Sequence, residues 1–166
     1  MNPMTVAELN PKADGLWRGS EFRKLLELEL RRSRRYQYFA SLLIIEANSV
    51  LVGRLGKGTG DVLQKIAALL RKELRETDLV GLQNERFVTV LLPYSDRAAT
   101  RCVAGRLTSW LAGFLGGEGL GDASQVKVGG ASFPSHATDL DSLIQRAGEM
   151  LSRASFVSNE AIQILE

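Results

Sequence analysis

At 166 residues the chain has the size of one domain, which buries roughly two-thirds of its unfolded surface and needs no disulfide or metal to fold. Its apolar content of 45% and charged content of 24% are ordinary for a globular protein, and no apolar run is long enough to span a membrane. The net charge of +2 argues against a nucleic acid duplex as partner. Because the start of the chain lacks a basic region followed by an apolar core, we expect no secretory signal and a cytoplasmic protein.

The spacing of apolar residues predicts a single α+β domain after a short N-terminal tail. Helical periodicity alternates with short apolar runs, and a short polar link between two β-rich runs is typical of a hairpin. The predicted elements are a helix at 21–37, a strand at 39–47, a helix at 61–77, strands at 79–83 and 87–92, a helix at 95–114, a strand at 126–133, a helix at 139–154 and a strand at 161–165.

Three features that could carry chemistry have simpler interpretations. The basic run at 31–35 ends a helical pattern, where cations complement the helix dipole, although an anionic partner is the alternative. The lone Cys102 lies in an apolar-periodic helix without a second Cys or a His, so we expect a small core side chain. His136 lies in a loop with no acidic neighbour to orient it, which favours a surface role. We therefore expect no metal site and no catalytic triad.

Arg75 and Asp78 lie three positions apart at the end of the helix predicted at 61–77, directly before the hairpin. A guanidinium group can bond O6 and N7 of guanine, while a carboxylate accepts hydrogen bonds from N1 and N2. The pair therefore indicates a receptor for guanine rather than an enzyme. As a bare motif, without its position in the chain, the pair is interpreted as a helix-end ion pair.

Several phrases of the chain, in this order, resemble the GGDEF domain family of diguanylate cyclases. Among them are Gly60-Asp61, Arg75-Glu-Thr-Asp78, the Val-Leu-Leu-Pro run that ends at Pro93, and the Ala-Ser-Phe-Pro run that begins at Ala131. The resemblance implies a single domain over residues 14–166, preceded by a tail at 1–13. It also implies the palm-like α+β fold of nucleotide cyclases, a ferredoxin-like alpha-beta plait. Helices there flank a central, mostly antiparallel sheet.

The same resemblance implies that the cyclase machinery is largely absent. The family's Asp-x-Asp, whose leading Asp binds magnesium, falls at Ile44 and Glu46, and a methyl-rich side chain cannot ligate a hard cation. The Asn that reads the substrate guanine falls at Val52, whereas Asp61, the second guanine reader, is retained. An acid in the first turn of a helix also complements the helix dipole, which is an equal reason for Asp61.

The signature turn of the family falls at 83–87 or at 84–88, and Glu85 and Arg86 lie within it in either register. Both registers lose the glycines that let the backbone approach the phosphates. The Lys and Arg that clamp the triphosphate fall at about Ser155 and Asn159. We therefore expect a degenerate GGDEF domain, a pseudo-diguanylate cyclase rather than an enzyme.

By contrast, the family's inhibitory site for cyclic di-GMP is retained, because Arg75 and Asp78 match its Arg-x-x-Asp and Arg106 matches its third residue. This implies a catalytically inactive receptor that binds the second messenger cyclic di-GMP, needs no cofactor and signals to an unidentified protein partner. Ligand binding could also drive homodimerisation. The alternatives are a nucleotide-independent protein-interaction scaffold and, less expected, a residual diguanylate cyclase.

Overall fold

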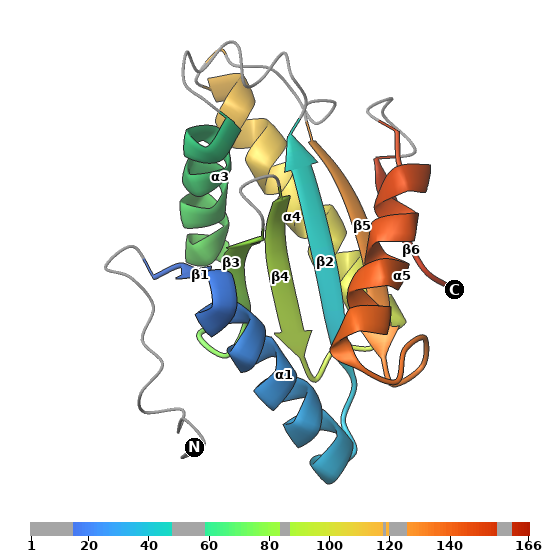
Figure 1. Ribbon diagram of the computed structural model, residues 1–166. Helices are drawn as coiled ribbons and strands as arrows, with labels where there is room; N and C mark the ends of the chain where they lie inside the picture. The colour runs from blue at the N-terminus through green and yellow to red at the C-terminus, as the bar shows by residue number, and fades with distance from the viewer. Residues whose placement is uncertain (1–14, 48–58, 84–86, 118, 120–125, 156–160) are drawn as a thin grey trace.

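The computed structural model describes residues 15–47, 59–83, 87–117, 119, 126–155 and 161–166. It has an α+β architecture, with helices on both faces of one six-stranded sheet (Figure 1). The elements are β1 (Trp17–Arg18), α1 (Gly19–Tyr36), β2 (Ala40–Ala47), α3 (Thr59–Glu73), β3 (Leu79–Gln83), β4 (Phe87–Pro93), α4 (Arg97–Gly117), β5 (Val126–Phe133), α5 (Leu140–Arg153) and β6 (Ile162–Ile164).

The sheet has the strand order β1-β3-β4-β2-β5-β6. Its four central strands pair antiparallel, while the edge strands β1 and β6 run parallel to their neighbours. This arrangement confirms the predicted palm-like fold with a mostly antiparallel sheet. The strand β1 was not predicted, because two residues are too few to show a period of two.

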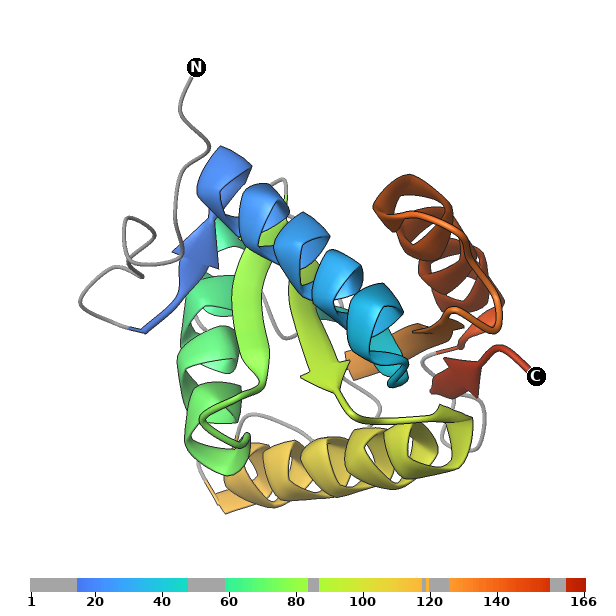
Figure 2. The same cartoon turned by 90° about the horizontal axis from the view of Figure 1, so that it is seen from below.

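Strand β2 shows how the two faces of the sheet are built. Successive side chains of a strand point to opposite faces, so Leu43 and Ile45 join one core cluster while Leu42 and Ile44 join the other. The first cluster lies under α3 and α4, and the second under α1 and α5. Figure 2 shows this layering, with α1 and α5 on one side of the sheet and α4 on the other.

Helix α5 lies directly on β5 at Gly129. A Cβ atom at this glycine would lie 2.2 Å from the backbone nitrogen of Leu151 and 2.5 Å from the carbonyl oxygen of Ala147. No side chain fits in that space, so the glycine permits the contact between helix and strand.

Two predictions about individual residues need correction. Cys102 is exposed on α4 and does not belong to the core, because the buried positions of this helix include Thr100 and Ala104 instead. Helix α3 ends at Glu73, four residues earlier than expected, so Arg75 lies in the turn that follows the helix. Among the described residues, no helix has the length and apolar character to cross a membrane.

Candidate functional site

The turn between α3 and β3 holds Arg75 and Asp78 in a fixed relation. The backbone N–H of Asp78 donates to the carbonyl oxygen of Arg75 at 3.0 Å. In return, the backbone N–H of Arg75 donates to Oδ2 of Asp78 at 2.8 Å. An Asp side chain that bonds a nearby backbone amide is a common way to stabilise a turn. The motif residues are thus held together by the main chain.

Arg71, near the C-terminal end of helix α3, stabilises the connection between α3 and β3 with two further hydrogen bonds. Its Nη1 donates to the carbonyl oxygen of Asp78 at 2.6 Å, and its Nη2 donates to the carbonyl oxygen of Arg75. Basic side chains near a helix C-terminus commonly bond its last carbonyl groups. Arg71 was not among the site residues predicted from the sequence. The available signal was a basic residue four positions before Arg75, at a helix end.

The carboxylate of Asp78 is buried, with only 5% of the residue exposed. Burial raises the pKa of Asp78 above its ordinary value, because an ionised carboxylate loses hydration. The bond from the Arg75 amide and the positive charges of Arg75, Arg71 and Arg106 oppose this rise in the pKa. The positive charges of three arginines therefore act on one buried acid.

Arg106 lies on α4, and its positive charge acts on Asp78. It is exposed, and the buried residues Ala104 and Leu107 on either side of it anchor the helix in the core. Arg75 is also exposed. Two exposed guanidinium groups from separate elements, beside a turn of fixed shape, can bond phosphate oxygens or the O6 and N7 edge of guanine.

This candidate site is a turn at the surface of the protein. A cavity of about 300 Å³ lies between α1, β3 and α5, with Arg23, Gln83 and Ile144 in its lining. Arg75, Asp78 and Arg106 do not line it. A ligand at the turn would be held by charge and hydrogen bonds more than by enclosure.

At the position of the family's first metal ligand, Ile44 is buried in β2 with 4% of its surface exposed, between Thr89 of β4 and Gly129 of β5. Glu46 follows on the same face of the strand. Its Oε2 pairs with Nζ of Lys127 at 3.2 Å, directly across the β2–β5 ladder. The Glu46 carboxylate is thus engaged with a cation of the protein.

The structure places the other sequence-predicted positions as follows. The backbone of Asp61 lies in the first turn of α3, and Ser155 is half-buried just after α5. Val52, Glu85, Arg86 and Asn159 lie outside the described residues. His136 is half-buried in a loop, where its Nδ1 accepts from the backbone N–H of Ser132 at 3.1 Å.

The family described as diguanylate cyclase, GGDEF domain, matches residues 15–156 of the chain. Among solved structures, the GGDEF domain of YfiN (TpbB) from Pseudomonas aeruginosa superposes with a TM-score of 0.71 at 23% identity, covering 92% of this chain and 98% of that chain. The GGDEF domain of FimX from the same species gives a TM-score of 0.71 at 14% identity, covering 95% and 99%.

A third structure, the GGDEF domain of DgcB from Caulobacter crescentus in complex with c-di-GMP, gives a TM-score of 0.70 at 10% identity. It covers 90% of this chain and 91% of that chain. No curated protein matches the chain significantly.

Proposed function

Because the chain belongs to the GGDEF domain family, we propose that it is a receptor for cyclic di-GMP that has no diguanylate cyclase activity and signals to a protein partner. The observation that carries the proposal is the cluster around Asp78. Arg71, Arg75 and Arg106 all place positive charge on this acid, which lies in a turn fixed by hydrogen bonds.

This cluster suits the two kinds of group that cyclic di-GMP presents. Its phosphates carry negative charge, which exposed guanidinium groups neutralise, and its guanines offer O6 and N7 to an Arg fork. The carboxylate of Asp78 accepts from the N1 and N2 hydrogens of guanine. The complex of c-di-GMP with the GGDEF domain of DgcB supports this choice of ligand, because that domain has the same fold.

The absence of cyclase activity rests on different residues. Diguanylate cyclases need a divalent cation to neutralise the triphosphate and activate the attacking hydroxyl, and Mg²⁺ takes oxygen ligands. Ile44 supplies methyl groups at the first ligand position, and Glu46 is paired with Lys127. A degenerate active site beside an intact effector site would leave ligand binding as the function of the domain.

A receptor also needs a response to the ligand. Cyclic di-GMP has two guanines and two phosphates, so one ligand can contact the Arg75 turn in two copies of the chain. Ligand-driven homodimerisation would present a new surface to the protein partner. The second candidate function is a scaffold in which the Arg75 turn stabilises the end of α3 and binds no nucleotide, and the bonds from Arg71 favour this role.

Isothermal titration calorimetry distinguishes these functions. The receptor predicts saturable binding of cyclic di-GMP and no binding of GTP with magnesium. Binding of neither nucleotide would leave the scaffold, and binding of GTP with turnover would indicate a residual cyclase. Sedimentation of the same samples would show whether the ligand produces a dimer.

A further inference from the structure

Exposed aromatic side chains gather at the end of the molecule where α1 stops and β4 leads into α4. Tyr36 is 64% exposed, Phe39 46% and Tyr94 69%. They come together because Ala40 of β2 pairs with Pro93 of β4, which brings the residues before β2 beside the residues after β4. A contiguous group of exposed aromatic side chains indicates an interaction surface.

The ring of Tyr94 is positioned by a neighbouring ring and by a nearby backbone hydrogen bond. The rings of Tyr38 and Tyr94 stack with centroids 4.0 Å apart, and the backbone N–H of Ser95 donates to the carbonyl oxygen of Phe39 at 3.2 Å. Tyr94 has a φ of +58°, a conformation that a non-glycine residue rarely adopts. The backbone therefore supports a ring whose face opposite Tyr38 is open to a planar group.

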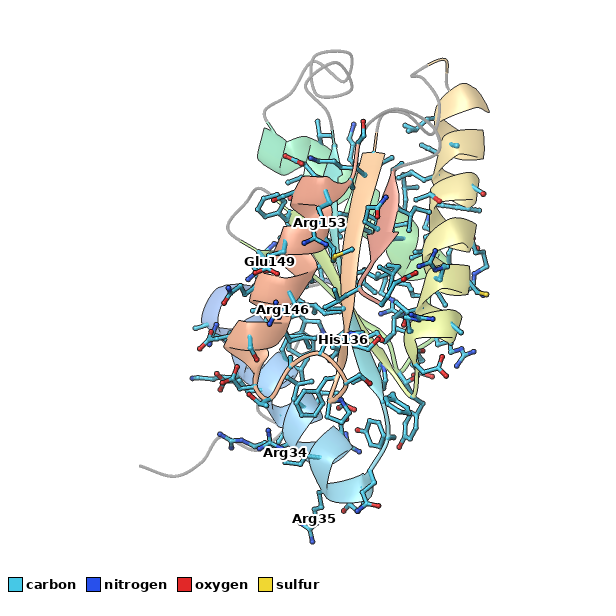
Figure 3. All side chains as sticks on the ribbon, turned by 90° about the vertical axis from the view of Figure 1, so that its right-hand side faces the viewer. Arg34, Arg35, His136, Arg146, Glu149 and Arg153 are labelled. Carbon is cyan, nitrogen blue, oxygen red and sulfur yellow. The ribbon has the colours of Figure 1, made fainter. Side chains whose placement is uncertain are left out.

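Arginines of the last turns of α1 flank this surface. Arg35 lies 5.6 Å from the ring centroid of Tyr36, and Arg34 lies 5.5 Å from that of Phe133. Figure 3 shows Arg34 and Arg35 at this end of α1. Within the part of the chain that the structure describes, Arg32 pairs with Glu29, whereas no carboxylate pairs with Arg31 or Arg35. Arg34, by contrast, donates to the carbonyl oxygen of Thr138, and its charge acts on Asp139. Among these arginines, Arg31 and Arg35 are therefore the ones available to an external anion.

We propose that this aromatic–arginine end (Arg31, Arg35, Tyr36, Phe39 and Tyr94) binds single-stranded nucleic acid, a function separate from the cyclic di-GMP site. Proteins that bind single strands combine cations that contact phosphates with aromatic rings on which bases stack. Every cation of the basic run is an Arg and none is a Lys, and the planar guanidinium both forks onto phosphate and stacks on rings.

Two other occupants fit less well. A second copy of this surface would place the arginines of one chain against those of the other, which costs energy. An anionic lipid surface attracts Lys and Arg alike, and it accepts aromatic rings without requiring that two of them be held in a stack. A single strand uses both the charge and the open ring face.

The test is fluorescence anisotropy of labelled twelve-nucleotide oligo-dT and oligo-U with the full chain at several salt concentrations. Tyr94→Ala should weaken binding by about tenfold, within the range expected for one stacked base. Arg31→Ala with Arg35→Ala should weaken binding and should make the dependence of log K on log salt shallower by roughly 0.7 for each phosphate that the protein no longer neutralises. Cyclic di-GMP binding should be unchanged in both variants.

The matched control removes the same charge elsewhere, with Lys65→Ala on α3 and Arg153→Ala on α5, two exposed residues away from this end. Oligonucleotide binding should survive in this control. Equal weakening in the control, or binding that tolerates Tyr94→Ala, would overturn the site. Competition by polyglutamate as strong as by oligo-dT would show a general anion surface instead, and binding of anionic vesicles without binding of oligonucleotide would show a lipid surface.

Discussion

The backbone N–H of Arg75 donates to Oδ2 of Asp78 at 2.8 Å, so the two ends of the Arg-x-x-Asp motif are joined through the main chain. Asp78 consequently has two roles. It stabilises the turn after α3, and in the proposed receptor it offers an acceptor to the ligand. Substitutions that separate these roles give the first prediction.

Asp78→Asn should keep an acceptor oxygen for the Arg75 amide, so the free energy of unfolding should change little. Binding of cyclic di-GMP should weaken, and the preference for guanine over adenine dinucleotides should relax, because an amide nitrogen replaces one acceptor oxygen. Asp78→Ala should lose both roles and lower the free energy of unfolding by about 1 kcal/mol, as for loss of a cap. Denaturation and titration with both dinucleotides measure this. Full guanine preference in Asp78→Asn would show that the carboxylate does not read the base.

Binding of cyclic di-GMP should weaken as the pH falls through the pKa of Asp78, which burial places above its ordinary value of 3.8. Protonation removes an acceptor for the guanine hydrogens, so ligand binding should in turn lower this pKa.

The free energy of unfolding should depend on pH in the opposite direction to ligand binding. The folded state holds the proton more tightly than the unfolded state, so this group's contribution to stability decreases as the pH rises from 3.8 through the raised pKa. Ligand titrations and denaturation experiments across this pH interval, with Asp78→Asn as control, test both pH dependences. The same pH dependence in Asp78→Asn would show that Asp78 is not the group responsible.

Arg71→Ala should lower the free energy of unfolding by about 1–2 kcal/mol, because the carbonyl groups of Arg75 and Asp78 lose a charged donor. It should also weaken cyclic di-GMP binding, since the turn that presents Arg75 is less ordered. Arg71→Lys should restore part of the stability, having one donor group instead of a fork. Chemical denaturation and calorimetry measure the two effects. A stability equal to that of the native protein would show that Arg71 does not hold the turn in solution.

Incubation with GTP and magnesium should yield no cyclic di-GMP, because Ile44 offers no oxygen to a cation. The single substitution Ile44→Asp should not restore activity, since it also buries an acid in the core under α1 and α5. Chromatography of the reaction products measures this outcome. Steady product formation by the native chain would mean that other residues supply the metal ligands.

The sequence predicted most of the fold because long elements carry a clear period. Strand β5 has the bounds that were predicted, Val126–Phe133, and α1 and α5 differ from theirs by one or two residues at each end. The error at Cys102 arose because Thr100, a polar residue, occupies a buried position of α4. Its hydroxyl is satisfied by the carbonyl oxygen of Asp96 at 2.6 Å, a bond that periodicity does not reveal.

The residues of the candidate site stay a prediction. Arg75, Asp78 and Arg106 were named from their resemblance to a family motif, and in the structure the charges of Arg75 and Arg106 act on the carboxyl group of Asp78. The bond from the Arg75 amide and the contribution of Arg71 could not be predicted, because both depend on where α3 ends. The helix can continue for one more turn, or it can end where a side chain bonds the backbone. The spacing of apolar residues does not show which of the two occurs.

Titration of cyclic di-GMP into Arg75→Ala, with Lys72→Ala as the matched control, tests the central claim most directly. Both substitutions remove one exposed cation near the end of α3, so a general charge effect would appear equally in both. We expect binding about tenfold to a hundredfold weaker for Arg75→Ala, since a bidentate Arg contact contributes roughly 1–3 kcal/mol. Binding should be nearly unchanged for Lys72→Ala, and the melting temperature should be unchanged for both. Native affinity in Arg75→Ala would contradict the receptor and leave the Arg-x-x-Asp turn as a structural feature of the helix end.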